Sequence, residues 1–330
     1  MTEEILFKIT KDQLETGMRG FPVGYCTTST VDPQKGLFYA GKPIPEVASW
    51  RPEDVIYLLM FGKTGSEKEV DTFFADLKKR SRLKPETVKA IERLPREGHP
   101  MKLFSVALLI LGMYEKNGNY KEDCYNLIAK VPHLVALIIN HHAGWGETPS
   151  PHPELGYMEN FAAMIRAPKT DLKKLTETFR LFNIVHYDHG GGNLSTFVGK
   201  AVASSLEDMY GSMASAICAL AGPLHGRANQ DCLEFLKEVV DEVGENATAP
   251  QVEKAIRDRL AAKKVVFGFG HAVLRVEDPR AQVIYDYLKK HYTTHPLVKI
   301  ALLLRSEGSK VLAENPKISD PHPNIDAIFG

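Results

Sequence analysis

Three histidine-bearing segments of this sequence contain residue types that could do chemistry. They read His186-Tyr-Asp-His189-Gly-Gly-Gly-Asn193, Gly222-Pro-Leu-His225-Gly and Gly268-Phe-Gly-His271. In each, glycine flanks a histidine. Glycine removes side-chain bulk near the imidazole ring and allows backbone angles that other residues avoid. A single histidine is more often a hydrogen-bonded structural residue, but three such segments within 86 residues favour a shared ligand site.

The third segment continues to Arg280 and adds two arginines, Arg275 and Arg280. Asp278 and Pro279 predict the N-cap and the first residue of a helix, because an Asp carboxylate can accept the free N–H groups of a first turn and proline has none to lose. Arg280 then falls in the first turn, where a cation opposes the helix dipole by roughly a few tenths of a kcal/mol. We therefore expect an anion beside Arg280 and a pocket for a small carboxylate ligand.

Three other kinds of site fit the sequence less well. The histidine pairs His186/His189 and His141/His142 lack the glutamate of HExxH, and no cysteine cluster accompanies them, so we expect no metal. The segment 268–270 does not extend to GxGxxG and follows no predicted strand, which argues against a Rossmann dinucleotide site. The absence of GxSxG from the sequence argues against a serine hydrolase of that type.

Composition limits the partners and the compartment. The 41 Lys and Arg residues balance the 41 Asp and Glu residues, so no global charge favours nucleic acid or a membrane surface. The longest apolar run, Leu103–Tyr114, is too short to span a bilayer. The N-terminal residues resemble neither a secretory signal nor an Arg-rich transit peptide. We expect a cytoplasmic protein, with a mature protein of the mitochondrial matrix as the alternative.

The hydrophobic pattern is helical almost throughout from Pro52 onward, and the predicted fold class is all-α. Residues Met101–Tyr114 are apolar on nearly every side, which is typical of a helix in a large core or a subunit interface. We expect further helices over 125–142, interrupted at Pro132, and over 194–220. Many small residues in 194–220 indicate close helix packing, either inside one subunit or across a dimer contact. Leu37–Tyr39 favours a short strand.

Length and cysteine spacing add two expectations. A chain of 330 residues is long enough for two domains. Its four cysteines are widely separated and form no CxxC motif, which favours reduced thiols over a disulfide framework or a zinc cluster. They are Cys26, Cys124, Cys218 and Cys232.

Taken together, the segments closely resemble the citrate synthase family. The 222–226 segment, the thirteen residues Gly268–Arg280 and the late segment Pro323-Asn-Ile-Asp326 match the three catalytic segments of that family in order and approximate spacing. The 186–193 segment is similar to the oxaloacetate-binding loop in the mitochondrial-type form. The residues alone give Asp326 no role beyond a solvated carboxylate or a helix cap.

The resemblance implies a fold, a reaction and an assembly. The fold is an all-α homodimer, with a large dimerisation domain over 1–226 and a small CoA-binding and catalytic domain over 227–330. The reaction condenses acetyl-CoA with oxaloacetate and water to give citrate and CoA, the entry into the tricarboxylic acid cycle. It makes the enzyme an acyltransferase, a citrate (Si)-synthase. No cofactor is bound permanently, because acetyl-CoA is a co-substrate.

The resemblance also implies roles for individual residues. Asp326 is the base that removes a methyl proton from acetyl-CoA. His225 donates a hydrogen bond to the thioester oxygen, and His271 polarises the oxaloacetate carbonyl. Substrate-binding residues implied in the same way are His189, Arg280 and Asn193. Residues implied to contact CoA are Val265, Val266, Gly268, Gly270 and Arg275.

One departure from the family pattern leaves alternatives open. The resemblance implies further helices after Pro323–Asp326, which carry two more oxaloacetate-binding arginines and return to the large domain. The 330 residues do not contain them, so we expect a chain truncated at its C-terminus. The alternatives to a citrate synthase are a 2-methylcitrate synthase that uses propionyl-CoA and a non-catalytic remnant that binds CoA or a dicarboxylate.

Overall fold

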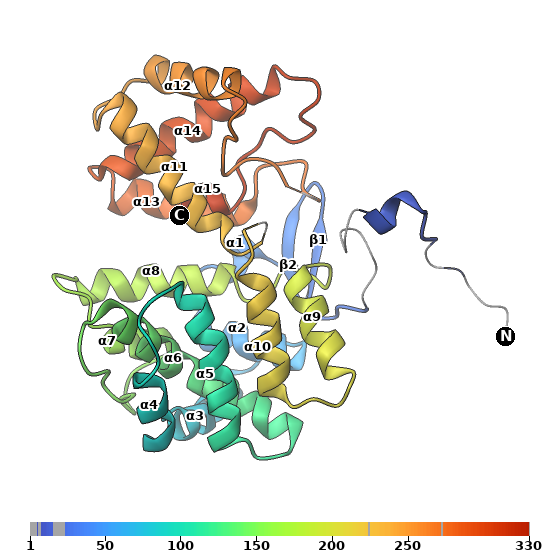
Figure 1. The fold of residues 1–330 in the computed structure, drawn as a ribbon, viewed down its shortest axis with the longest axis vertical. Helices are drawn as coiled ribbons and strands as arrows, with labels where there is room; N and C mark the ends of the chain where they lie inside the picture. The colour runs from blue at the N-terminus through green and yellow to red at the C-terminus, as the bar shows by residue number, and fades with distance from the viewer. Residues whose placement is uncertain (1–4, 6–7, 16–23, 224, 272, 330) are drawn as a thin grey trace.

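A computed structural model describes residues 5, 8–15, 24–223, 225–271 and 273–329, and shows helices arranged in two lobes (Figure 1). Leu224 and Ala272, inside two of the sequence motifs, lie outside the described residues. The predicted all-α class is confirmed, with one small sheet in addition. The helices of the larger lobe are α1 (Ile44–Val47), α2 (Pro52–Phe61), α3 (Glu67–Arg80), α4 (Pro85–Glu92), α5 (Pro100–Glu115), α6 (Tyr120–Ala143), α7 (Tyr157–Met164), α8 (Leu172–Val185), α9 (Leu194–Ala203) and α10 (Met209–Leu220).

The smaller lobe lies above the larger one in Figure 1. Its helices are α11 (Ala228–Val243), α12 (Ala249–Ala261), α13 (Pro279–His291) and α14 (Pro296–Ala313), followed by the short α15 (Asp326–Phe329) near the junction of the lobes. A 3₁₀ turn, η1 (Asp12–Glu15), lies near the N-terminus. Within the described residues, no helix has the length and apolar content needed to cross a bilayer.

A three-stranded antiparallel sheet lies beside the junction of the lobes. Its strands are β1 (Ser29–Asp32), β2 (Gly36–Tyr39) and β3 (Lys42–Pro43), so the strand expected at Leu37–Tyr39 is confirmed. The β1–β2 turn forms because Asp32 Oδ1 accepts the N–H groups of Gln34 and Lys35, at 2.8 and 2.9 Å. Gly36 closes the turn with φ +91°, a value that favours glycine.

The interruption predicted at Pro132 is wrong, because α6 continues through it. Proline lacks the N–H that would bond the carbonyl four residues earlier, which belongs to Ile128. The hydroxyl of Tyr157 in α7 donates to that carbonyl at 2.6 Å. A side chain from a neighbouring helix therefore replaces the missing backbone hydrogen bond, and the helix does not break.

The single helix predicted over 194–220 is also wrong, because the structure has α9 and α10 there. Leu206 lies between them with φ +66°, and Asp208 caps α10 by accepting the N–H of Gly211 at 2.9 Å. The two helices pack against each other. A Cβ added to Gly199 would lie 3.3 Å from the Cβ of Ala216, so small residues permit this close approach. At least at Gly199 and Ala216, small residues serve packing inside one subunit, and a dimer contact of these helices stays a prediction.

Three hydrophobic clusters form the core. The first joins α4, α5, α6 and α10, and the third lies within the smaller lobe between α11, α12 and α14. The second joins the sheet, α1, α2 and α8 of the larger lobe to Ile284 of α13 and to Ile325. The smaller lobe therefore has its own core, while α13 also packs against the larger lobe beside the sheet.

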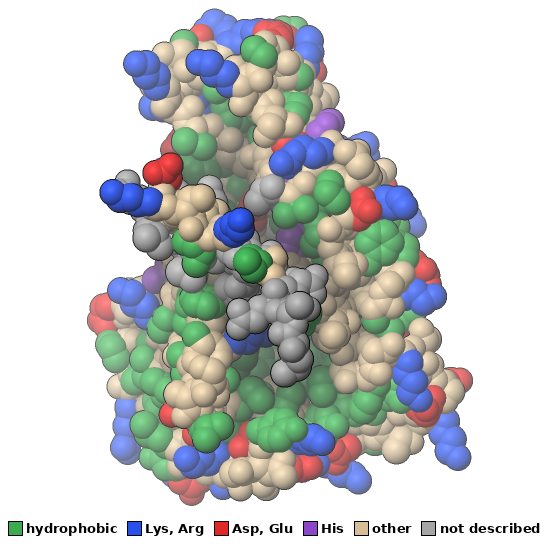
Figure 2. Space-filling model, turned by 90° about the vertical axis from the view of Figure 1, so that its right-hand side faces the viewer, with side chains coloured by type: hydrophobic (Ala, Val, Ile, Leu, Met, Phe, Trp, Pro, Cys, Tyr) green, Lys and Arg blue, Asp and Glu red, His purple; other side chains and the backbone are tan. Residues whose placement is uncertain are grey.

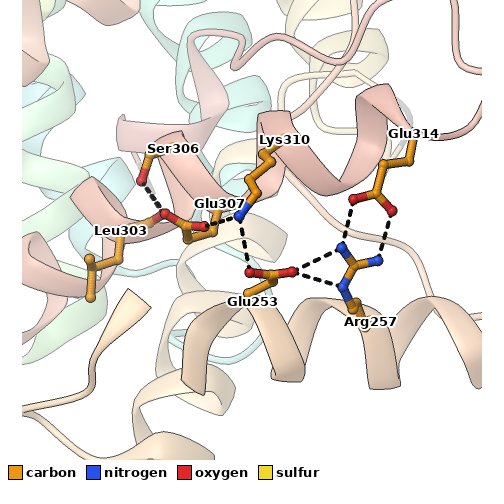
Figure 3. Close-up of polar contacts among 7 residues, drawn as sticks. All are labelled: Glu253, Arg257, Leu303, Ser306, Glu307, Lys310 and Glu314. Atoms are coloured by element: carbon orange, nitrogen blue, oxygen red, sulfur yellow. Dashed lines mark hydrogen bonds and ion pairs between the residues drawn. The ribbon is translucent and has the colours of Figure 1, made fainter. Parts of the chain in front are cut away.

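Charged side chains connect helices in both lobes. In the larger lobe, the buried carboxylate of Glu115 accepts hydrogen bonds from Lys130 Nζ and Thr87 Oγ1, both at 2.6 Å, which connects α4, α5 and α6. In the smaller lobe, Arg257 of α12 bonds both Glu253 and Glu314, so α12 and α14 are joined by a solvent-facing network (Figure 3). The Lys130–Glu115 pair is buried, so removing one of the two residues would leave an unpaired charge away from water.

The continuity of α6 gives a stability prediction. Replacing Tyr157 by Phe removes the hydroxyl that bonds the Ile128 carbonyl, and we expect unfolding free energy to fall by about 1–3 kcal/mol because the carbonyl then lacks a partner in a largely buried place. Chemical denaturation of both proteins measures the difference. The control is Tyr120→Phe, since Tyr120 is 70% exposed at the start of α6. Equal stability of Tyr157→Phe and the parent protein would contradict this account.

Candidate active site

Two segments that are 54 residues apart in sequence pair along their backbones and deliver two of the predicted catalytic side chains. Gly270 N–H donates to His322 O at 3.0 Å, and Asn324 N–H donates to Gly268 O at 2.9 Å. The Asn324 side-chain amide adds a bond to Gly270 O at 2.8 Å. His271 follows directly on one segment, and Asp326 lies two residues beyond the other, so this pairing places both near one another.

Gly268 is required by this pairing. It has φ +83°, and a Cβ added there would lie 2.6 Å from the Cα of Ala327. Any side chain at position 268 would therefore push back the first turn of α15, which carries Asp326. The CoA contact that the family resemblance implies for Gly268 stays a prediction, and in the structure Gly268 lies against the short helix that carries Asp326.

Asp326 is largely withdrawn from water. Its backbone N–H donates to Asn324 Oδ1 at 2.9 Å, which fixes the start of α15. Burial raises the pKa of the Asp326 carboxyl to about 6, and the nearby Arg280 charge lowers it only in part. A carboxylate with this pKa is a stronger base than an exposed one and is still mostly ionised at neutral pH.

The anion beside Arg280 in the structure is the Asp278 side chain of the protein itself, while the bound carboxylate ligand expected there stays a prediction. Asp278 Oδ1 accepts the backbone N–H of Arg280 at 2.9 Å, which confirms the predicted N-cap with Pro279 as the first helical residue. The same carboxylate accepts the guanidinium through Nε at 3.0 Å and Nη2 at 2.6 Å. Both residues are buried, so the pair fixes the Arg280 side chain. Among the described residues, Nη1 of Arg280 makes no hydrogen bond.

The proton of His271 can be placed from its partners. Its Nδ1 accepts the N–H groups of Val273 and Leu274, at 3.0 and 2.9 Å, so the ring carries its proton on Nε2 when neutral. Burial lowers the pKa of His271, and the neighbouring Arg280 charge lowers it further. His271 is therefore a neutral ring with one N–H donor, in an orientation set by its own backbone loop.

His189 faces His271 across the site. The two rings meet edge to face with centroids 5.2 Å apart. Burial lowers the pKa of His189 to about 3, with Arg280 and His271 adding to the effect, so this ring is neutral at physiological pH. Its Nε2 is buried and has no hydrogen-bond partner among the described residues. A buried ring nitrogen without a partner favours a ligand that completes its hydrogen bonding.

His225 lies in the segment between α10 and α11, and its ring contacts the first turn of α9. Its Nε2 is 3.0 Å from the hydroxyl of Ser195 and 3.4 Å from the Ser195 backbone N–H. The Ser195 backbone N–H donates to Nε2, so the neutral ring carries its proton on Nδ1, which is then a donor. The single hydroxyl proton of Ser195 goes either to Nε2 or to Asn193 Oδ1. Burial lowers the pKa of His225 and keeps it neutral. Within the described residues, no hydrogen bond or ion pair connects His225 with Asp326.

Asn193 is the N-cap of α9. Its Oδ1 accepts the Thr196 N–H and the Ser195 hydroxyl, both at 2.9 Å, and its amide donates to Gly190 O at 3.1 Å. These bonds connect the loop of His189 to the helix start that holds His225. The side chain of Asn193 thus has a positioning role in the structure, and its predicted contact with substrate stays a prediction.

The residues predicted to contact CoA lie in the segment between α12 and α13. Val265 is exposed, whereas Val266 packs into the core cluster of that lobe. Gly270, with φ +82°, is the turn that leads into His271. Arg275 directs its Nη1 back to the carbonyls of His271 and Leu274, at 3.2 and 2.6 Å, so part of its guanidinium is used to close the loop.

Sequence reasoning missed three supporting side chains: Ser195, Asn324 and Asp278 as the partner of the Arg280 guanidinium. Ser195 and Asn324 adjoin motif residues in sequence, but their types alone do not distinguish a surface residue from a positioning one. Among the described residues, no group of three or more His, Cys, Asp or Glu side chains is arranged to bind a metal ion. All four cysteines are free thiols.

Comparisons with known proteins show which family this chain belongs to. Residues 17–330 match the sequence model of the family described as "Citrate synthase, C-terminal domain". The chain is 36% identical over 349 residues to citrate synthase 4, mitochondrial, of Arabidopsis thaliana, which covers 98% of this chain and 73% of the relative. It is 32% identical over 351 residues to 2-methylcitrate synthase, mitochondrial, of Yarrowia lipolytica, which covers 99% of this chain and 75% of the relative.

A solved structure gives the same result for the fold. The crystal structure of citrate synthase from Pyrobaculum aerophilum matches with a TM-score of 0.81 at 28% sequence identity, covering 96% of this chain and 80% of that one. The similarity therefore extends over nearly all of the chain.

The raised pKa of Asp326 predicts a gain in stability when the carboxyl is replaced. The ordinary pKa of an aspartate carboxyl is 3.8, so above pH 6 the folded state contains an ionised Asp326 whose charge burial disfavours. We expect Asp326→Asn to raise the unfolding free energy at pH 7.5 by roughly 2–3 kcal/mol. Below pH 4 the gain should disappear, because the carboxyl is then protonated in both states.

Denaturation curves at several pH values measure this difference. Asp286→Asn is the control, since Asp286 lies exposed on α13 and should show no such gain. A constant difference between Asp326→Asn and the parent protein from pH 4 to pH 8 would contradict the burial argument.

Proposed function

This chain belongs to the citrate synthase family, and we propose that it carries out the family's reaction with the side chains described above. It is a citrate (Si)-synthase, an acyltransferase that condenses acetyl-CoA, oxaloacetate and water into citrate and CoA. The reaction needs no resident cofactor, and acetyl-CoA is a substrate. The observation that carries the assignment of residues is the Asp326 carboxylate, whose pKa partial burial raises, within electrostatic reach of Arg280 and Asp278.

The first step is removal of a methyl proton from acetyl-CoA. A thioester α-proton is a very weak acid, so the base must be strong and the developing enolate charge must be offset by an oriented donor. Asp326 is the base, because burial raises its proton affinity while leaving it ionised at neutral pH. His225 donates from Nδ1 to the thioester oxygen, with Ser195 fixing the ring through Nε2.

The second step forms the carbon–carbon bond. The enol carbon attacks the oxaloacetate carbonyl, whose oxygen gains negative charge. His271 offsets that charge through its Nε2–H, since its Nδ1 is occupied by two backbone N–H groups. Hydrolysis of the resulting citryl thioester then releases CoA and citrate.

Oxaloacetate is held by groups that need a carboxylate. Arg280 is fixed by Asp278 and offers Nη1, while His189 offers a buried Nε2 with no partner among the described residues. The Asp278–Arg280 pair is close to neutral, so the site favours a dianion less than a free arginine would. The CoA contacts of Val265, Val266, Gly268, Gly270 and Arg275 are proposed on the same basis, with Val265 the exposed member of its pair.

The assembly we propose is a homodimer of two-domain subunits, with domains over 1–226 and 227–330. The hydrophobic residues Val106, Leu109 and Met113 lie exposed along one side of α5. Met213 of the neighbouring α10 is exposed as well, and Figure 2 shows hydrophobic side chains gathered over the lower part of the face on which α9 and α10 lie. Burial of this surface against a second copy would remove it from water.

The compartment we propose is the mitochondrial matrix. The Arabidopsis and Yarrowia relatives are both named mitochondrial, which supports this alternative. The same names give no support to the cytoplasm, which the N-terminal composition had favoured.

A 2-methylcitrate synthase is the second candidate, because the Yarrowia relative bears that name. Propionyl-CoA differs from acetyl-CoA by one methylene, and a pocket discriminates between such substrates by only about 1–3 kcal/mol. The ratio of kcat/KM for the two thioesters decides between them, and a ratio that favours propionyl-CoA would overturn the citrate assignment.

The function is tested by CoA release from acetyl-CoA and oxaloacetate, followed with a thiol reagent. We expect turnover by the parent protein and a fall in kcat of roughly 10- to 100-fold for Ser195→Ala, because the His225 ring loses the hydroxyl that fixes it. Oxaloacetate binding should change little. Ser204→Ala is the control, since that exposed hydroxyl at the end of α9 bonds only Ala201 O among the described residues.

Two outcomes would contradict the proposal. Absence of CoA release by folded parent protein would remove the synthase function and leave a binding remnant. Unchanged kcat in Ser195→Ala would remove the proposed orientation of His225 while leaving the function in place.

A further inference from the structure

The β1–β2 hairpin contacts the loop of His189 along its strands. The Gly190 N–H donates to Ser29 Oγ at 2.6 Å, and the hydroxyl of Thr28 donates to the carboxylate of Asp188. The Asp188 N–H lies 3.4 Å from the buried hydroxyl of Tyr39. Both residues that flank His189 are therefore bonded to the hairpin or to the residue that precedes it.

The turn of the same hairpin contacts the catalytic segment of the smaller lobe. The Arg275 N–H donates to Pro33 O at 2.9 Å. At the other end of the turn, Gly36 is buried against the ring of Pro279. Figure 1 shows β1 and β2 at the level where the two lobes meet. One hairpin thus contacts both loops that carry the residues proposed to bind oxaloacetate. The strands of the hairpin contact the loop of His189 in the larger lobe, and its turn contacts the segment before Arg280 in the smaller lobe.

We propose that this hairpin is a positioning element for oxaloacetate, which sets the separation of His189 and Arg280, and that Gly36 is its critical residue. The inference rests on the proposed function in so far as the ligand is oxaloacetate. It adds a role for residues that touch neither substrate. Contact with the same hairpin also explains how His189 and Arg280, which come from different lobes, keep a fixed separation without a hydrogen bond between them.

The role of Gly36 follows from its contact with Pro279. A Cβ added to Gly36 would lie 2.6 Å from Pro279 Cδ and closer still to Cγ, whereas carbon atoms normally pack at about 3.5–4.0 Å. The ring would have to move by about 1 Å. Pro279 is covalently bonded to Arg280 and directly follows Asp278, so this movement displaces the ion pair. A misplacement of that size costs about 10²-fold in a positioned site.

The test compares Gly36→Ala with Gly41→Ala. Both glycines have positive φ, +91° and +82°, so both variants carry similar backbone strain. A Cβ at Gly41 meets no atom within 4 Å, so only Gly36→Ala disturbs Pro279. The measurements are the rise in melting temperature produced by oxaloacetate, which reports binding without turnover, and the separate KM and kcat values.

We expect Gly36→Ala to weaken oxaloacetate binding and raise its KM by about 10- to 100-fold. Gly41→Ala should bind oxaloacetate as the parent protein does. Adding Pro279→Ala to Gly36→Ala removes the Cγ and Cδ atoms that the new methyl group meets, and should recover part of the lost affinity. If Gly36 served only stability, Gly36→Ala would lower the melting temperature, and adding Pro279→Ala would not bring the KM for oxaloacetate back toward the parent value.

The outcomes separate the inference from the function. If the parent protein shows no stabilisation by oxaloacetate, the proposed function and this inference both fail. If the parent protein binds and Gly36→Ala binds equally well, the inference alone is overturned. Should Gly36→Ala not fold, Ser29→Ala decides, because it removes the hydroxyl that accepts the Gly190 N–H, together with a longer contact to Cys26 Sγ at 3.8 Å. Weaker oxaloacetate binding by Ser29→Ala supports the inference, and unchanged binding overturns it.

Discussion

The pairing of residues 268–270 with residues 322–324 is the constraint on which the site depends. Its hydrogen bonds of 2.8–3.0 Å fix two loops that would otherwise move independently. His271 directly follows one paired segment and Asp326 lies two residues after the other, so the backbone pairing helps to position both residues. Gly268 makes the pairing possible, because any Cβ there would collide with Ala327.

Burial gives the groups of this site their chemical character. The pKa of Asp326 rises to about 6, while His189, His225 and His271 are kept neutral. A neutral histidine donates a hydrogen bond without competing for the proton that the base removes. The buried Asp278–Arg280 pair adds a cation whose charge is already balanced, which lowers the cost of burying it. Burial thus has opposite effects on the two kinds of group. It raises the pKa of the carboxyl, which is still ionised at neutral pH, and it lowers the pKa of the three rings, which are neutral.

The fold class, most of the helices and the N-cap at Asp278 could be predicted from the sequence, because each depends on residues close together along the chain. The helices follow from hydrophobic periodicity, and the Asp278 N-cap follows from the order Asp, Pro, Arg. What could not be predicted depends on residues distant along the chain. Pro132 leaves α6 intact because Tyr157 supplies the missing hydrogen bond, and no local pattern reveals that. The Ser195–His225 contact spans 30 residues. The split of α9 from α10 is a local feature that the sequence reasoning missed, since Asp208 is an N-cap residue and Leu206 before it has φ +66°.

The central claim is that Asp326 is the base and that burial sets its pKa. The pH dependence of kcat/KM for acetyl-CoA tests this claim most directly, because the free enzyme's base must be ionised to react. We predict that the rate is constant above neutral pH and falls as pH decreases through a midpoint near 6, where Asp326 takes up a proton. A rate that stays constant to pH 5, or falls with a midpoint near the ordinary aspartate value of 3.8, would contradict the account.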